Sequence, residues 1–136
     1  YWPVYFGALR DRLKPGANAT LQIITVPDRR WEVYRRGVDF IQKYIFPGGM
    51  LPSPGALRAE IARAGLTLKG SAEFGDSYSQ TLRRWRETFE ARWDEVARLG
   101  FDERFRRMWT LYLASCAGAF GGGNCDVTQI TVTRPA

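Results

Sequence analysis

The sequence predicts an α/β fold with about three strands, and three segments carry that prediction. Residues 19–26 are rich in β-branched side chains and alternate little in polarity, which is typical of strands buried on both faces of a sheet. Residues 66–74 form a second strand pattern, and residues 126–134 alternate regularly between two faces. Helical patterns separate the three segments, and this order favours a layered sheet in which the first two strands are parallel.

Turn signals and apolar periodicity define the helices of the first half of the chain. Residues 2–13 form a helix pattern that ends at Lys14-Pro15-Gly16. Asp28 is placed to cap a helix over residues 29–45, where apolar side chains recur at spacings of three and four: Trp31, Tyr34, Val38, Ile41 and Ile45. Phe46-Pro47-Gly48-Gly49 then ends this helix, because proline cannot continue it.

Three more helices are expected before the last strand. Ser53-Pro54 begins a short helix that runs to about Ala64, with proline at a position that the first turn allows. Two long helices follow, over about 77–98 and about 102–120, and Asp102 is placed to cap the second. Each long helix carries an apolar stripe rich in aromatic residues. Such stripes are far more often part of a hydrophobic core than of a ligand site.

The composition is that of a folded protein with an excess of basic residues. The chain of 136 residues is 45% hydrophobic and 14% aromatic, which argues against disorder. Its net charge is +6, and nearly all of the positive charge is arginine. Because arginines alternate with acids over residues 83–107, a solvated face with ion pairs is the simpler interpretation. An anionic membrane surface or nucleic acid is the alternative, but no nucleic-acid-binding module is recognisable.

Several common signals are missing from the sequence. There is no histidine, and the two cysteines have no metal-ligand spacing, so no metal site is expected. Cys116 lies on an apolar helical stripe, which predicts a buried free thiol. No run of about 18 apolar residues predicts a transmembrane helix, and no signal peptide is recognisable. Since the first residue is Tyr1 rather than methionine, the chain is expected to be part of a longer protein.

Four groups of residues form a specific combination. The first is Lys43-Tyr44-Ile45-Phe46-Pro47 with Gly49 and Leu51-Pro52-Ser53. The others are Tyr78 with Thr81-Leu82 and Trp85, Phe105 with Arg107-Met108 and Tyr112-Leu113, and Cys116-Ala117-Gly118-Ala119-Phe120. Because of these four groups, nearly the whole chain resembles one family of enzymes. It is similar to the C-terminal part of the cyclopropane-fatty-acyl-phospholipid synthase and mycolic acid cyclopropane synthase family. The members of that family are S-adenosylmethionine-dependent methyltransferases.

This resemblance implies an α/β fold that is the C-terminal half of a Rossmann-like class I methyltransferase sheet. Residues 19–26 and 66–74 would be its fifth and sixth strands, and residues 126–134 would return antiparallel between them as the seventh. The helices at about 77–120 would be a helical lipid-binding insertion. In the family, the glycine-rich loop that binds S-adenosyl-L-methionine lies upstream. The N-terminal cofactor-binding half is therefore expected to be absent from residues 1–136.

The resemblance also implies that three residues help to hold a catalytic bicarbonate. Tyr78 falls where the family places a tyrosine that hydrogen-bonds this anion, and Ile24 falls where the family uses a backbone group. Gln22 stands at the position of a family histidine, and the strand period of two puts residues 22 and 24 on one face. Glutamine donates a hydrogen bond but cannot take up a proton as imidazole does. Anion binding is expected to persist, with a methyl-branched or methylene product as an alternative to a cyclopropane ring.

These positions also have structural interpretations. Tyr78 would pack on the first turn of its helix, and Gln22 would be a buried polar residue bonded to neighbouring backbone. Tyr44 and Phe46 are expected to border the acyl or donor channel. Hydrophobic packing around the Pro-Gly turn is the alternative for both.

The function that the resemblance implies belongs to the complete enzyme. It would transfer a methyl or methylene group to the double bond of an unsaturated acyl chain of phospholipid, in the cytoplasm and peripheral to the inner face of the membrane, without nucleic acid as a partner. Residues 1–136 alone are expected to be inactive. Because they would expose a sheet edge, they are also expected to form a homo-oligomer or swapped dimer. The alternative from another class is a non-catalytic basic module that binds lipid or a partner.

Overall fold

The computed structural model describes all 136 residues, which form two compact units. We call them the sheet unit and the helical unit. The sheet unit consists of Tyr1–Gly37, Met50–Phe74 and Asp126–Ala136. The helical unit consists of Val38–Gly49 and Gly75–Cys125. Neither unit is one continuous stretch of the chain, so both depend on contacts between residues far apart in the sequence.

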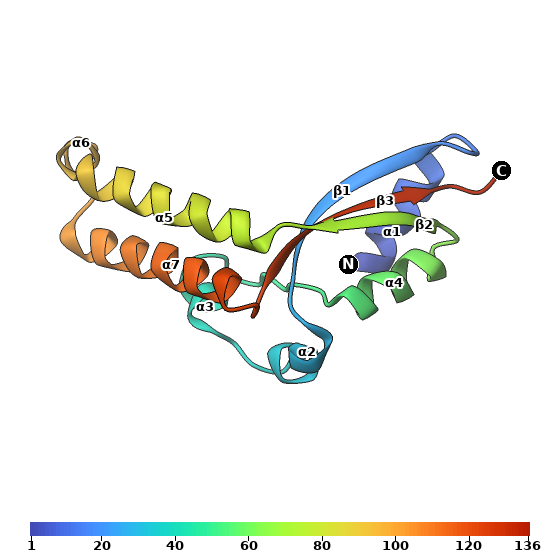
Figure 1. Cartoon of the computed structure of the whole chain (residues 1–136), viewed down its shortest axis with the longest axis horizontal. Coiled ribbons are helices and arrows are strands. Elements are labelled where there is room, and N and C mark those ends of the chain that lie inside the picture. The colour runs from blue at the N-terminus through green and yellow to red at the C-terminus, as the bar shows by residue number, and fades with distance from the viewer. The chain divides into compact units, whose positions relative to one another are not determined.

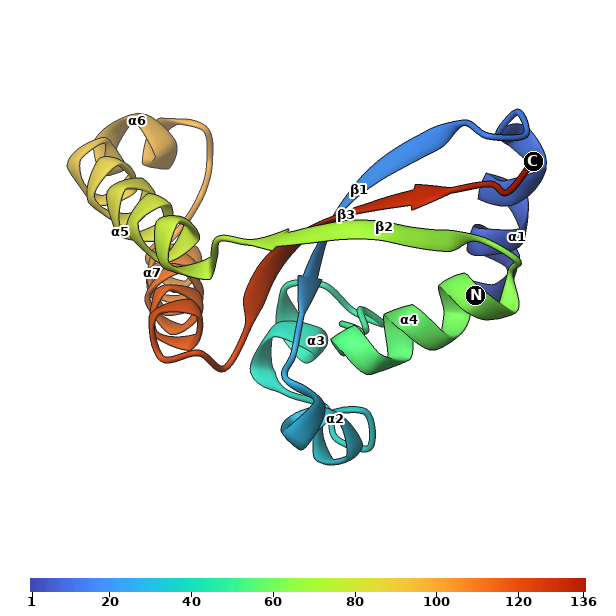
Figure 2. The ribbon, with the colours of Figure 1, turned by 45° about the vertical axis from the view of Figure 1, so that its right-hand side comes forward.

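The sheet unit is built on three strands, β1 (Asn18–Thr25), β2 (Thr67–Glu73) and β3 (Asp126–Thr133). Their order in the sheet is β1-β3-β2, and β3 is antiparallel to both neighbours. The first two strands therefore run in the same direction on either side of β3 (Figure 1, Figure 2). This confirms the expected arrangement, in which the last strand returns between the other two.

Two helices, α1 (Trp2–Arg12) and α4 (Pro54–Arg63), cover one face of this sheet (Figure 2). Both carry proline in the first turn, where the missing N–H leaves no hydrogen bond unmade. The core between helices and sheet is a cluster of seven buried residues: Phe6, Leu57, Ile61, Ala64, Leu66, Ile130 and Val132. Burial of these apolar side chains is the main force that holds the unit together.

The expectation that the first strand is buried on both faces is wrong. Along β1, exposed residues alternate with partly buried ones up to Gln22. Leu21 and Ile23 pack against the core cluster, whereas Thr20 and Gln22 are exposed on the opposite face. The physical reason is that α1 and α4 cover one face only, so the polar side chains of β1 collect on the other.

The single helix expected over residues 29–45 is also wrong. The segment contains two helices, α2 (Asp28–Tyr34) and α3 (Phe40–Tyr44). A capping box starts the second helix: the Asp39 carboxylate accepts a hydrogen bond from the Gln42 backbone N–H at 2.8 Å, and the Gln42 side-chain oxygen accepts from the Asp39 backbone N–H at 3.0 Å. The spacing of apolar residues continues across the break, so periodicity did not reveal it, but Val38 between the two helices is 76% exposed and belongs to no buried face.

Asp28 does not cap α2 as expected. Pro27 occupies the N-cap position, and no side chain bonds to that helix end. The Asp28 carboxylate instead accepts a hydrogen bond from the backbone N–H of Gly55, in the first turn of α4. Ser53, at the N-cap of α4, accepts from the Ala56 backbone N–H, as the sequence predicted.

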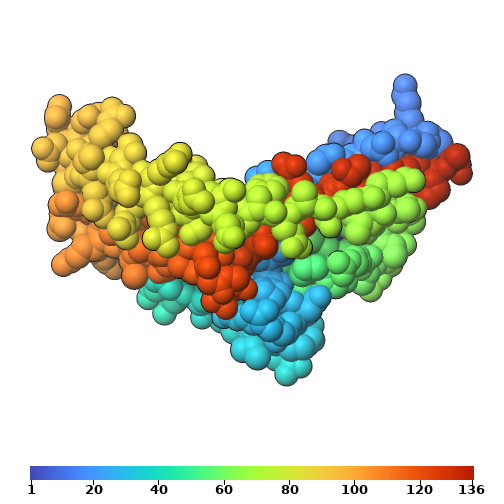
Figure 3. Space-filling model, viewed as in Figure 1, coloured from blue at the N-terminus to red at the C-terminus, as the bar shows by residue number.

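The helical unit is built on α5 (Gly75–Ala91) and α7 (Glu103–Gly121), which run antiparallel and side by side (Figure 1, Figure 3). Leu82 and Leu113 are 1% and 2% exposed. The Ser79 hydroxyl donates a hydrogen bond of 2.7 Å to the Ala117 carbonyl, which ties the start of α5 to the end of α7. Asp102 caps α7 through the Phe105 backbone N–H, as expected.

The expected helix over 77–98 is two helices, since α5 ends at Ala91 and α6 spans Trp93–Arg98. Arg92 separates them with backbone angles of φ −106° and ψ 21°, outside the helical region. Its guanidinium binds the Glu95 carboxylate at 2.6 Å, in the first turn of α6. The side chain of the break residue therefore stabilises the new helix start. No helix of the chain combines the length and apolar character needed to cross a membrane.

Candidate functional site

Gln22 and Ile24 lie on one face of β1, as the strand period predicted. In the register with β3, Gln22 stands directly opposite Gln129 and Ile24 opposite Val127. Gln129 Nε2 donates a hydrogen bond of 3.1 Å to Gln22 Oε1. The structural alternative for Gln22, a buried residue bonded to neighbouring backbone, is therefore wrong. Its side chain is exposed and bonds to another side chain.

A second polar pair continues this face toward the start of β1. The hydroxyls of Thr20 and Thr131 lie 3.2 Å apart, two residues before the glutamine pair along β1. The face therefore carries two successive cross-strand side-chain hydrogen bonds, the second at Gln22, three residues before the carboxyl end of β1 at Thr25. In open α/β sheets, ligands bind outside the carboxyl ends of the parallel strands, so the glutamine pair is on the side where chemistry is expected.

Tyr78 lies in the first turn of α5, in the helical unit. Its ring contacts Phe120 edge-on at 4.9 Å between centroids and Trp85 edge-on at 6.1 Å. The ring therefore packs against α7 as well as along its own helix, and not only on the first turn that we considered as the structural alternative. Neither contact uses the phenol hydroxyl, so ring packing leaves the hydroxyl able to donate a hydrogen bond.

Phe46 and Tyr44 also belong to the helical unit, and both are more than half exposed. Phe46 contacts Tyr112 edge-on at 6.1 Å, whereas the Tyr44 ring lies 5.2 Å from Lys43 Nζ. The turn between Phe46 and Gly49 is closed by a 2.9 Å hydrogen bond from the Gly49 N–H to the Phe46 carbonyl. Gly48, at φ +80°, occupies the position that requires a left-handed residue. The turn thus presents Phe46 to the aromatic residues of α7.

Tyr112 and Cys116 were predicted only as part of an apolar stripe, but they form a polar contact within it. Burial raises the pKa of Tyr112 to about 12 and the pKa of Cys116 to about 11, and their side chains are hydrogen-bonded. Cys116 is a buried free thiol, which confirms the expectation from the sequence. Both groups are therefore neutral at physiological pH and suit an apolar lining.

Aromatic rings continue along α7 from Tyr112. Each ring contacts the next at centroid distances between 4.4 and 5.8 Å, in the order Phe101, Phe105, Trp109 and Tyr112. With Phe46 at its end, this row is a continuous apolar and polarisable surface. Aromatic faces attract positive charge, so the row suits both an acyl chain and a transient cation.

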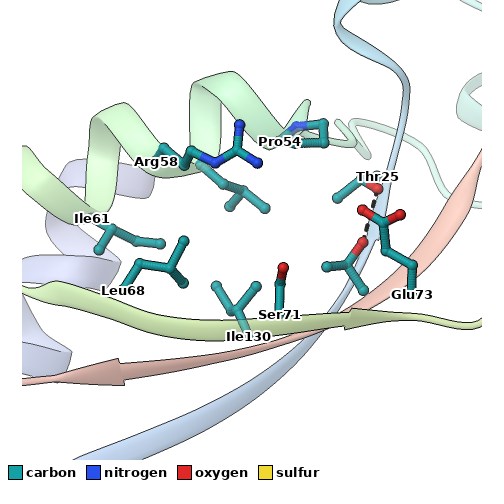
Figure 4. A pocket seen from close by; sticks show the side chains of 10 residues that line it. Thr25, Pro54, Arg58, Ile61, Leu68, Ser71, Glu73 and Ile130 are labelled. Atoms are coloured by element: carbon teal, nitrogen blue, oxygen red, sulfur yellow. Dashed lines mark hydrogen bonds between the residues drawn. The ribbon is translucent and has the colours of Figure 1, made fainter.

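A separate pocket lies in the sheet unit between α4 and the sheet. Apolar side chains including Ile61, Leu68 and Ile130 line it, with Arg58 from α4 and Glu73 from β2 beside them (Figure 4). The hydroxyls of Thr25 and Thr128 bond to each other at 3.2 Å on one side of this space. None of the residues predicted for the site lines the pocket, and we assign it no role in the chemistry.

The predicted site residues divide between the two units. Gln22 and Ile24 belong to the sheet unit, and Tyr78, Tyr44 and Phe46 belong to the helical unit. Within the units, the structure joins Gln22 to Gln129, Phe46 to Tyr112 and Tyr78 to Phe120. Gln129 was missed because the register of β1 on β3 is needed to place it.

The order β1-β3-β2, with an antiparallel strand between two parallel ones, places the chain among the α/β folds of methyltransferase type. The family model described as mycolic acid cyclopropane synthetase matches residues 1–130. The chain therefore belongs to the mycolic acid cyclopropane synthetase family, as the residue motifs suggested. The match covers the helical unit, most of the sheet unit and all of the predicted site residues.

Individual relatives agree with this assignment. The chain is 46% identical over 134 residues to the tuberculostearic acid methyltransferase UfaA1 of Mycobacterium tuberculosis, covering 98% of this chain and 31% of that protein. It is 35% identical over 134 residues to the cyclopropane-fatty-acyl-phospholipid synthase of Escherichia coli K12, covering 98% and 33%. The chain thus spans about a third of the length of the curated relatives it matches.

A solved structure extends the likeness to three dimensions. The mycolic acid cyclopropane synthase CmaA1, complexed with SAH and CTAB, superposes with a TM-score of 0.86 and 26% identity. The superposition covers 97% of this chain and 49% of that one. Both units of the chain therefore have counterparts in a solved cyclopropane synthase.

Proposed function

We propose that residues 1–136 are the C-terminal part of an S-adenosylmethionine-dependent methyltransferase. The enzyme adds a methyl or methylene group to the double bond of an unsaturated acyl chain of phospholipid. The observation that carries this proposal is the match of 98% of the chain to two enzymes whose names specify fatty acid methyl transfer and fatty-acyl-phospholipid cyclopropanation. The bound SAH in the CmaA1 structure supports S-adenosyl-L-methionine as the donor.

In this proposal the helical unit, including the helices at about 77–120, binds the acyl chain. The aromatic row on α7 and the exposed ring of Phe46 supply the apolar surface that an acyl chain needs. Tyr44 borders the same channel. The neutral Tyr112 and Cys116 add no charge to this lining, and uncharged aromatic walls suit a carbocation because they do not attack it.

Gln22, Ile24 and Tyr78 help to hold a bicarbonate that acts as the base in ring closure. The residues fit such an anion in their chemistry: Gln22 has an exposed amide and Tyr78 a phenol, and both donate hydrogen bonds. Gln22 cannot accept a proton as histidine does, so it binds and orients rather than relays protons. We propose that the donor binds to a glycine-rich loop that is not among residues 1–136, and these residues alone are expected to be inactive.

The experiment measures methyl transfer by the complete enzyme, which is expressed from the open reading frame that encodes this chain. The enzyme is incubated with methyl-labelled S-adenosyl-L-methionine and vesicles of unsaturated phospholipid. We expect label in the lipid, and mass spectrometry of the released fatty acids distinguishes cyclopropane from methyl-branched and methylene products. No label in lipid under any condition would refute the proposal.

The enzyme is proposed to act in the cytoplasm at the inner face of the membrane. The excess of six basic residues favours binding to an anionic membrane surface. A non-catalytic basic module that binds lipid or a partner would share this charge. Vesicle flotation over a series of salt concentrations separates the two: salt-sensitive binding without methyl transfer favours the module, and binding with methyl transfer favours the enzyme.

Residues 1–136 expressed alone are proposed to associate with one another. The outer edges of β1 and β2 have no strand partner within the chain, and such edges recruit other strands. Light scattering coupled to size exclusion is expected to give a dimer or larger species. A monomer with a cooperative unfolding transition would contradict this proposal.

A further inference from the structure

The amides of Gln22 and Gln129 form a directional pair on the exposed face of the sheet. The two residues are direct cross-strand partners, and Gln129 Nε2 donates to Gln22 Oε1 at 3.1 Å. Gln129 comes from the far end of the chain, 107 residues away from Gln22. The antiparallel return of β3 between β1 and β2 therefore creates the pair.

The direction of this hydrogen bond matters for an anion ligand. A glutamine side chain has a donor end, the NH₂ group, and an acceptor end, the carbonyl oxygen. Its last torsion is broad, so an unrestrained side chain presents either end. Because Gln129 occupies the carbonyl oxygen of Gln22, the NH₂ group is the end that remains to donate to an anion.

We infer that Gln129 is a positioning residue that holds the Gln22 amide with its NH₂ group available to the bound anion. This inference rests on the proposed function, in which Gln22 helps to bind bicarbonate. Gln129 itself need not touch the anion. Its role is to remove the orientation in which the Gln22 carbonyl oxygen would repel a negative charge.

The same geometry suggests how the chain accommodates glutamine where the resemblance implies histidine. An imidazole has one nitrogen that a neighbour can fix and another that faces the ligand. A primary amide reproduces this division only if its carbonyl oxygen is held. Gln129 supplies that restraint with a single hydrogen bond, and the cross-strand register keeps it in place.

The neighbouring Thr20–Thr131 pair provides a matched control. It lies on the same face of the same two strands, and its two hydroxyls are 3.2 Å apart. Thr131→Val removes a cross-strand side-chain hydrogen bond without touching either glutamine. Any general loss of sheet stability from a lost polar pair should appear in this variant too.

The test measures methyl transfer by the complete enzyme to dioleoyl-phosphatidylethanolamine vesicles, in carbonate-depleted buffer with bicarbonate titrated back. Gln129→Leu is expected to raise the half-saturating bicarbonate concentration about tenfold, which corresponds to about 1.4 kcal/mol of binding free energy. The maximal rate should change little. Thr131→Val should match the wild type, and an equal bicarbonate dependence in Gln129→Leu would overturn the inference.

A reversed pair tests orientation directly. In Gln129→Glu, the ionised carboxylate only accepts hydrogen bonds, so Gln22 must turn its NH₂ group toward residue 129 and its oxygen toward the anion. This variant should require more bicarbonate than Gln129→Leu. Adding Gln22→His should restore bicarbonate binding, because an imidazole donates to the glutamate through one nitrogen. If charge repulsion alone caused the loss, the double variant would stay as poor as Gln129→Glu.

A second readout does not depend on catalysis. In enzyme labelled with ¹⁵N-glutamine, bicarbonate is expected to shift the side-chain NH₂ resonances of Gln22 in the wild type, with at least a tenfold weaker response in Gln129→Leu. This result would support the inference even if no methyl transfer were found and the proposed reaction failed. The absence of a bicarbonate-dependent shift in the wild type would overturn it.

Discussion

The carboxylate of Asp28 accepts a hydrogen bond from the backbone N–H of Gly55 at 3.0 Å, and so joins the start of α2 to the first turn of α4. Hydrogen bonds from the Ser53 side chain and the Gly55 N–H lower the pKa of Asp28 below its ordinary value. Ionised Asp28 therefore stabilises the N-terminal end of α4, where carboxylates are favoured by the free N–H groups.

Asp28→Ala is expected to destabilise the chain by about 1 kcal/mol at pH 7, the usual cost of losing a helix cap. The pKa of Asp28 is lower in the folded state, so its contribution is complete above about pH 4, the ordinary pKa of aspartate, and is lost as the pH falls through the lower folded value. Urea unfolding at pH 7 and pH 3 measures this. A difference between variant and wild type that is the same at both pH values would contradict it.

Gly55→Ala should disturb the same contact from the other side. A Cβ atom at this position would lie 2.8 Å from the Asp28 carboxylate oxygen, closer than van der Waals contact allows. Because the exposed carboxylate must move away, its hydrogen bond from the Gly55 N–H is lost, and we expect a loss of about 1 kcal/mol in unfolding free energy. The control is Gly118→Ala in α7, where nothing lies within 4 Å and alanine should stabilise the helix by about 0.5–1 kcal/mol. If Gly55→Ala raised Tm as Gly118→Ala should, Gly55 would have free space and the prediction would be wrong.

Cys116 is predicted to react slowly with alkylating reagents. Burial raises the pKa of its thiol to about 11, so only about 0.1% is thiolate at pH 8, and the thiolate is the reactive form. Iodoacetamide at pH 8 should therefore modify Cys125, which is partly exposed, well before Cys116. Peptide mapping over time separates the two sites, and equal labelling rates would show that Cys116 is accessible.

Tyr78→Phe is predicted to lower methyl transfer by the complete enzyme about 10- to 100-fold, the range expected for losing one hydrogen bond to a charged group. Folding should be unaffected, because the ring contacts with Phe120 and Trp85 do not use the hydroxyl. Tyr5→Phe, an exposed tyrosine on α1, is the matched control. An unchanged rate in Tyr78→Phe would remove this residue from the catalytic site.

Much of the fold could be predicted because its signals are local. Strand composition located β1 and β2, alternation located β3, and Ser53 and Asp102 marked the starts of α4 and α7 correctly. The missed break between α2 and α3 also had a local signal, since aspartate at 39 and glutamine at 42 have capping-box spacing. Apolar periodicity concealed it, because the spacing of three and four continues across the break, although Trp31 and Tyr34 belong to the sheet unit and Ile41 and Ile45 to the helical unit.

The candidate site could be predicted only in part. Strand period placed Gln22 and Ile24 on one face, and this requires no knowledge of neighbouring strands. The partner of Gln22 requires the register between β1 and β3, which depends on contacts more than 100 residues apart in the sequence. In the same way, the row of rings from Phe101 to Phe46 combines α7 and a residue just before it with a turn more than 50 residues earlier.

By itself, the sequence determined the three strands, the starts of α4 and α7, the family and the residue types available for chemistry, because composition, spacing and caps act over a few residues. Only the tertiary structure decided which face of β1 is exposed, that Asp28 bonds to the first turn of α4 rather than capping α2, and that Gln129 faces Gln22. Those outcomes depend on which surfaces meet when the chain closes. A hydrogen bond between distant residues forms only after the packing of apolar faces has set the register of strands and helices.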